Sequence, residues 1–135
     1  MAITLQTIAS SLGAKLIKDE MTTTPASGQT AAIAPKTSNA TAGTGSILYT
    51  QIVNPNSHAI WLHAIDATSA TVGTSVSAFK WKVAANTTLS MNFAEVNGQT
   101  GMAFTAGLTY WILKDADYTT TVGPDSTVTV YFLTT

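Results

Sequence analysis

Apolar and polar residues alternate with a period close to two from residue 46 onward, which is typical of strands with one buried face. Phe79, Trp81 and Val83, for example, alternate with two lysines. Seven such segments follow one another: Ile47–Asn54, His58–Ala67, Phe79–Val83, Thr87–Phe93, Met102–Thr105, Leu108–Lys114 and Ser126–Leu133. Many short strands separated by polar turns predict an all-β fold, with an antiparallel β-sandwich of the jelly-roll or Ig-like type over residues 47–135.

Two short segments between these strands have strong turn-forming composition. The run Asn54-Pro55-Asn56-Ser57 predicts a turn after the first strand, so we expect the first two strands to form a hairpin. Ala85-Asn86 predicts a turn between the strands at 79–83 and 87–93.

Two of the predicted strands are apolar on both faces. Trp61 and His63 lie on the opposite face of their strand from Leu62, and Trp111 is flanked by apolar residues in the strand at 108–114. A strand that is apolar on both faces suits a sheet whose outer face is also covered. We therefore predict Trp61, His63 and Trp111 as interface residues, covered by the N-terminal segment or by a neighbouring subunit.

Residues 1–20 follow a different period. Ile8, Leu12 and Leu16 stand at i, i+4 and i+8, which is the spacing of one face of a helix, although Gly13 costs about 1 kcal/mol relative to Ala. We predict an N-terminal helix here. Because an isolated helix of this length is marginal in water, it must pack on its own sheet or on another subunit, and these three residues are predicted interface residues.

Residues 21–46 consist almost entirely of small residues and include two prolines. This composition predicts an extended low-complexity arm, with a short strand at 30–34 and an eighth sandwich strand as open alternatives. The arm buries too little apolar surface to offset roughly 1–2 kcal/mol of backbone entropy per residue. We therefore expect contacts with other chains to order it.

The composition narrows the possible functions. The chain has 135 residues with no Cys and no Arg, a formal charge of −1, charged residues at 10% and 25 Thr. Without Cys there is no disulfide framework or thiolate metal site, and without clustered cations we expect no nucleic-acid partner. No apolar run approaches the roughly 20 residues of a membrane span, and no basic segment precedes the first apolar residues, so we expect neither a membrane partner nor a secretory signal.

The candidate chemical groups do not converge along the sequence. His58 lies in a turn and His63 on a strand, with a spacing that puts them on opposite faces and does not suit a shared metal. No Gly-x-Ser-x-Gly is present, and Ser75 and Ser77 have no acid nearby in the sequence. We therefore predict no catalytic residues, no enzymatic activity, no metal and no cofactor.

Two further groups allow alternative interpretations. Asp115 and Asp117, with Asp125 nearby, offer oxygens to a calcium ion, but EF-hand spacing is absent and a polar loop between strands is favoured. The three tryptophans at 61, 81 and 111 would suit a sugar-stacking platform, although a strand Trp more often belongs to a core or an interface.

The stretch from about Gly45 to Leu133 resembles the small β-sandwich virion proteins of tailed bacteriophages. The resemblance rests on ILYTQIVN with its Asn-Pro-Asn-Ser turn, VAANTTL at 83–89, GMAFTAGLTY at 101–110 and STVTVY at 126–131. The apolar-x-x-Gly-Leu-x-apolar phrase ahead of a final strand is typical of that group. No functional residue is transferred by this resemblance.

The resemblance implies a non-enzymatic structural protein of the virion, made in the host cytoplasm. Capsid decoration is the role we expect, with the protein itself as a homo-oligomer and the major capsid protein as partners. A neck, tail or fibre-base role is the alternative within that class. A carbohydrate-binding module that uses Trp and Asp-loop residues is the alternative from another class.

Overall fold

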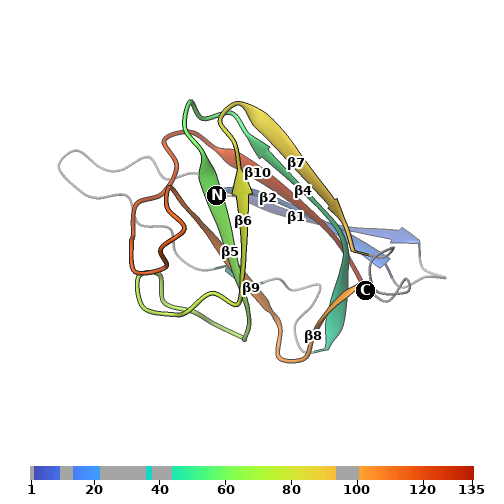
Figure 1. Cartoon of the computed structure of the whole chain (residues 1–135). Helices are drawn as coiled ribbons and strands as arrows, with labels where there is room; N and C mark the ends of the chain where they lie inside the picture. The colour runs from blue at the N-terminus through green and yellow to red at the C-terminus, as the bar shows by residue number, and fades with distance from the viewer. Residues whose placement is uncertain (1, 10–13, 22–35, 38–43, 94–100) are drawn as a thin grey trace.

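The computed structural model describes residues 2–9, 14–21, 36–37, 44–93 and 101–135. These residues form two antiparallel sheets and contain no helix (Figure 1). The all-β, antiparallel prediction is therefore confirmed for this part of the chain.

The larger sheet, sheet A, has the order β1-β2-β10-β4-β7, and β8 pairs with the start of β4. Its strands are β1 (Ala2–Ala9), β2 (Ala14–Met21), β4 (Gly45–Asn54), β7 (Thr87–Asn92), β8 (Met102–Phe104) and β10 (Val128–Thr134). The smaller sheet, sheet B, has the order β3-β9-β5-β6, with β3 (Lys36–Thr37), β5 (Ile60–Asp66), β6 (Phe79–Val83) and β9 (Leu108–Leu113). All seven strands predicted after residue 46 are present, because their apolar residues alternate as burial requires.

The two sheets face each other across one shared core, which gives a sandwich-like arrangement. Tyr110 of β9 and Phe132 of β10 meet at its centre, with ring centroids 4.9 Å apart and planes inclined by 61°. The fully buried residues around them come from both sheets and include Ile17, Ile52, Ile60, Leu62, Phe104, Ile112, Val128 and Val130. Whether the topology is of the jelly-roll or the Ig-like type stays a prediction.

The predicted N-terminal helix is wrong for the described residues, because 2–9 and 14–21 form an antiparallel hairpin. β2 also pairs with β10, from Met21 opposite Val128 to Lys15 opposite Thr134. The spacing of Ile8, Leu12 and Leu16 fits a helix, but the segment is also rich in β-branched Ile and Thr. Pairing on the edge of β10 supplies long-range hydrogen bonds that local periodicity does not reveal. Leu12 itself lies outside the described residues.

The predicted hairpin between the first two sandwich strands is also wrong. β4 belongs to sheet A and β5 to sheet B, so the Asn-Pro-Asn-Ser turn is a corner between the sheets. The turn at Ala85-Asn86 is confirmed, but it too crosses between sheets, from β6 to β7. Asn86 has a φ of 52°, a left-handed conformation that Asn tolerates better than most residues. A strand apolar on both faces, such as β5, needs cover on both faces: sheet A covers the inner one, and the cover of the outer one is described below.

The predicted arm at 21–46 lies largely outside the described residues, including the short strand predicted at 30–34. Its described part contains β3, which pairs with β9 through Lys36 opposite Tyr110 and Thr37 opposite Thr109. A short additional strand from this region is therefore present.

A buried polar contact fixes β2 against the opposite sheet. The Tyr110 hydroxyl donates a hydrogen bond of 2.9 Å to Oδ2 of Asp19, and both residues have no exposed surface. A buried carboxyl group is tolerated only where hydrogen bonds replace water. Burial and the neighbouring Asp19 carboxylate raise the pKa of Tyr110, so its hydroxyl keeps its proton and stays a donor.

Candidate interaction surface

The outer face of sheet B is covered by the chain itself. Trp111, Leu113 and His63, all on this face, have no exposed surface. Two loops lie over them, at 67–78 and 114–127, on the side of sheet B that faces away from sheet A (Figure 1). The covering that the sequence predicted for this face therefore comes, in this structure, from loops within the same chain.

His63 ties both loops to the sheet. Its Nδ1 lies 2.9 Å from Oγ of Ser77 in one loop, and its Nε2 lies 2.9 Å from the backbone oxygen of Asp115 in the other. The ring stacks on Trp111 with centroids 5.7 Å apart and an interplanar angle of 11°. Because the carbonyl accepts, Nε2 carries the proton, and the serine hydroxyl donates to Nδ1. Burial lowers the pKa of His63, so this fully hydrogen-bonded neutral form is favoured.

The outer face of sheet A is not covered in this way. It consists of alternate residues of β2, β10, β4 and β7, set side by side by the strand register. We call the following twelve residues the open face: Leu16, Lys18, Glu20, Tyr49, Gln51, Val53, Thr88, Ser90, Asn92, Thr129, Tyr131 and Leu133. None of them is fully buried and none packs in the core, and Figure 1 shows no described strand or loop over them.

The open face is apolar and aromatic at one end and polar in the middle. Leu16, Leu133 and Tyr49 stand in one row across three strands, and Tyr131 lies in the next row between Lys18 and Gln51. Lys18 and Glu20 are its only charged residues, and their ion pair of 3.0 Å leaves no net charge. This face is therefore suited to contacts that depend on shape and apolar burial more than on charge.

The small area of the open face limits how strongly a single copy can bind a partner through it. Strands lie about 4.8 Å apart and residues rise about 3.4 Å, so four strands and five residue positions span roughly 300 Å². A stable protein–protein interface usually buries about 800 Å² on each partner. One open face alone thus gives a weak contact, which becomes strong only when many copies bind together.

The six interface residues predicted from the sequence are distributed over different surroundings. Leu16 lies on the open face, opposite Leu133. Trp61 is half-buried on the outer side of β5, with Nζ of Lys82 5.9 Å from its ring centroid. His63 and Trp111 are buried under the loops. The side chain of Ile8 and all of Leu12 lie outside the described residues. The sequence reasoning missed Tyr49 and Tyr131, although their alternation with inward-facing residues was a readable signal.

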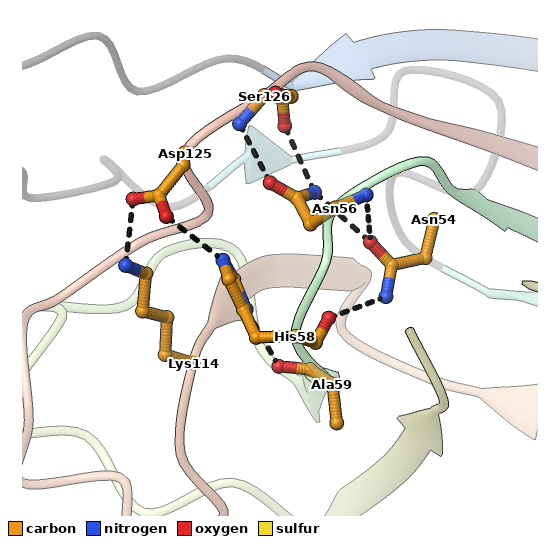
Figure 2. Close-up of polar contacts among 7 residues, drawn as sticks. All are labelled: Asn54, Asn56, His58, Ala59, Lys114, Asp125 and Ser126. Carbon is orange, nitrogen blue, oxygen red and sulfur yellow. Dashed lines mark hydrogen bonds and ion pairs between the residues drawn. The ribbon is translucent and has the colours of Figure 1, made fainter. Parts of the chain in front are cut away.

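His58 belongs to a network at the corner between the sheets (Figure 2). Nε2 of His58 lies 3.2 Å from Oδ2 of Asp125, and Nδ1 of His58 lies 3.0 Å from the backbone oxygen of Ala59. Oδ1 of Asp125 accepts a 2.6 Å hydrogen bond from Lys114. The hydrogen bond from Lys114 lowers the pKa of Asp125. A catalytic triad needs one histidine nitrogen on the acid and the other on a nucleophile. Here the second nitrogen faces a carbonyl, so the pair is arranged to hold the corner.

The two corner asparagines complete this network. Oδ1 of Asn54 accepts hydrogen bonds of 3.0 and 2.9 Å from the backbone and side-chain nitrogens of Asn56, and its Nδ2 donates to the backbone oxygens of His58, Val83 and Ala84. Asn56 donates a hydrogen bond from its Nδ2 to the backbone oxygen of Ser126 and accepts one at its Oδ1 from the backbone nitrogen of Ser126, as Figure 2 shows. These side-chain hydrogen bonds satisfy backbone groups at the corner, where the strand-to-strand hydrogen bonds of sheet A end and the chain passes to sheet B.

The carboxylates of Asp115 and Asp117 accept hydrogen bonds from backbone nitrogens of their own loop. Oδ1 of Asp115 accepts from the backbone nitrogen of Asp117 at 3.2 Å, and Oδ1 of Asp117 accepts from that of Thr119 at 2.9 Å. These are turn-forming contacts, and the hydrogen bonds from Thr119 lower the pKa of Asp117. Among the described residues, no group of three or more His, Asp or Glu side chains is placed to hold a metal ion.

The contact between Ser77 and His63 is a nucleophile–base pair that the sequence reasoning missed, because the two are brought together by a loop. The histidine is fully buried under Trp111 and both loops. The other ring nitrogen of His63 is bonded to the backbone oxygen of Asp115, where a triad needs an acid. The pair is therefore arranged as a structural hydrogen bond.

The three tryptophans do not form one platform. Trp81 points into the core, where it contacts Phe79 and Phe93, whereas Trp61 and Trp111 lie on the outer side of sheet B. A hollow of about 280 Å³ lies at the corner, and its lining contains no aromatic residue: Val53, Asn54, Pro55, Asn86, Thr87 and Thr88. A sugar-stacking site would need an aromatic face there.

None of the described residues belongs to a helix long and apolar enough to span a membrane. The chain matches no protein-family model, no curated protein and no solved structure. The case for a function therefore rests on the residues and their geometry.

Proposed function

We propose that this protein is a non-enzymatic structural component of a bacteriophage particle, and specifically a decoration protein that stabilises the head. The observation that carries the proposal is the open face of sheet A, which presents two tyrosines and two leucines with no net charge. Its partners are the major capsid protein and further copies of the chain. No catalytic group takes part.

The small size of the open face supports a role on a lattice. A contact of roughly 300 Å² is weak by itself, but a capsid offers many equivalent sites, and linked weak contacts add up to strong attachment. Low charge makes such attachment nearly independent of salt. A sandwich-like body whose other face is closed by its own loops presents one side to the particle and the other to solvent.

The direct test removes the protein from the particle by deletion or stripping, followed by heating or osmotic shock. Decoration predicts shells that leak or burst earlier than intact ones, and re-addition of the protein should restore them. Unchanged shells that lack tails or fail to adsorb would move the assignment to the neck, tail or fibre base. Specific binding of a soluble glycan would favour a carbohydrate-binding module.

A matched pair of variants connects this test to the open face. Tyr131→Lys places a charge at its centre, and Val76→Lys places the same charge on a loop over sheet B, where Val76 is 60% exposed. We expect only Tyr131→Lys to lose particle binding. Equal binding by both variants would contradict the use of this face.

The non-enzymatic part of the proposal is tested at Ser77. A serine-reactive fluorophosphonate should leave the folded protein unlabelled, because the second ring nitrogen of His63 is bonded to the backbone oxygen of Asp115 in place of an orienting acid. Stoichiometric labelling that is lost in Ser77→Ala would contradict it and indicate a hydrolase.

A further inference from the structure

Five strands form the outer edges of the two sheets among the described residues, and three of them have features that limit pairing with another chain. A free edge exposes alternate backbone N–H and C=O groups, and proteins protect such edges with lysines, short strands or β-bulges. β6 carries Lys80 and Lys82, β3 is only two residues long, and β8 is only three. β7 is neutral but spans only six residues, directly after the corner at Ala85-Asn86.

β1 is the longest of these edge strands and carries no lysine. It is eight residues long and contains neither a charged residue nor a proline. Its register against β2 is regular from Ala2 to Thr7, and the one irregularity falls between Thr7 and Ala9. Among the described residues, no strand pairs with its outer side. A regular, neutral edge of this length is a template for an added strand.

We propose that β1 of one molecule pairs antiparallel with β1 of a second copy, which joins two sheets A into one continuous sheet. A neutral segment meets itself without like-charge repulsion. Pairing of β1 with itself is isologous and closes as a dimer, whereas pairing of β1 with a different edge would propagate into fibres. This inference concerns the isolated chain and goes beyond the role proposed for the open face.

The symmetry restricts the register. A twofold axis that joins two antiparallel edge strands must be perpendicular to the sheet, so the residue on the axis lies opposite itself. An axis at Leu5 pairs Ile3 with Thr7 and Thr4 with Gln6 of the other copy, and uses the stretch before the irregularity. An axis at Gln6 would draw in the irregular part. An axis at Thr4 would also stay within the regular stretch, but it would leave Thr7 without a partner in that stretch. Leu5 is the centre taken for the test.

The absence of Cys from the chain makes this register directly measurable. Leu5→Cys should form a disulfide-linked dimer under mild oxidation, because residues directly opposite each other have Cα atoms within the roughly 4.4–6.8 Å that a disulfide spans. Gln6→Cys and the β7 control Ser90→Cys should cross-link at least about tenfold more slowly, since their equivalent Cα atoms lie beyond roughly 7 Å.

Sedimentation of the uncross-linked protein gives a second, independent measurement. The unmodified chain should dimerise, and Gln6→Lys should be a monomer, because an edge lysine is tolerated in the fold but blocks strand addition. Its melting curve should match that of the unmodified chain at concentrations where the unmodified dimer has dissociated. Tyr131→Lys should remain a dimer, which separates this inference from the function proposed for the open face. Equal cross-linking rates for the three cysteine variants, or an unmodified chain that is monomeric at all concentrations, would overturn the proposal.

Discussion

The outer faces of the two sheets both carry apolar side chains, but they differ in what covers them. On sheet B, Trp111 and His63 are sealed beneath two loops of the same chain. On sheet A, Tyr49 and Tyr131 lie on a face that no described segment covers. The same alternation in sequence thus contributes to folding on one sheet, and on the other it leaves a face that the proposed function uses for association. Substitutions on the two faces should separate these roles.

The largest effect is expected beneath the loops. Trp111→Ala removes a large, fully buried ring and leaves a cavity, and should lower the free energy of unfolding by about 3–5 kcal/mol. Urea denaturation followed by far-UV circular dichroism measures this loss. A cost below about 1 kcal/mol would show that the loops collapse onto the sheet without the ring, and that the covering is not specific.

A smaller effect is expected where the two loops touch. Gly73 has a φ of +85°, and a Cβ added to it would lie 2.8 Å from Cγ2 of Thr121 in the other loop. Gly73→Ala should cost about 1–2 kcal/mol from the left-handed backbone alone, and more from the clash. The double variant Gly73→Ala/Thr121→Ser removes the clash and should recover only that second part. Equal stability of the single and double variants would mean that the loops do not meet here.

The next effect depends on pH and concerns the residue that ties both loops to the sheet. Burial lowers the pKa of His63 below its ordinary value of 6.5, so the unfolded chain binds a proton more readily than the folded one. Stability should therefore fall as the pH drops below that value. His63→Gln should lack this part of the decline in urea titrations at about pH 7.5 and about pH 5. Parallel declines in both proteins would contradict it.

Asp66 adds a pH dependence of its own in the acid range. Hydrogen bonds from the backbone nitrogens of Thr105, Ala106 and Gly107 lower its pKa from 3.8 to about 2. Its contribution is present above the unfolded value and is lost as the pH falls toward about 2.

The smallest effect on stability is expected on the open face. Tyr131→Ser and Tyr49→Ser should change the free energy of unfolding by less than about 1 kcal/mol, because these side chains pack in no core. Under the proposed decoration function, they should nevertheless weaken binding to the particle. A loss comparable to that of Trp111→Ala would show that the open face is part of the folding core, and the contrast between the two sheets would be lost.

The strands after residue 46 could be predicted from sequence because each repeats a two-residue period between clear turn residues. The assignment of strands to sheets could not, since the turn at Asn54-Pro55-Asn56-Ser57 looks the same in a hairpin and in a corner. The N-terminal strands were missed because β2 is stabilised by β10, a neighbour distant in sequence. The contact of His63 with Ser77 depends on the path of a loop, and no local pattern reports it.

The pairing of β2 with β10 affects the order in which the strands of sheet A can assemble during synthesis. β2 pairs with β10, and its buried Asp19 accepts a hydrogen bond from Tyr110, which lies 91 residues further along the chain. Such distant contacts form slowly, because a long loop must close before they bring any gain. During synthesis the N-terminal hairpin therefore emerges well before the strand that holds it, and sheet A closes only after the rest of the sandwich has been made. Any assembly that uses its β1 edge is thereby delayed until the molecule is finished.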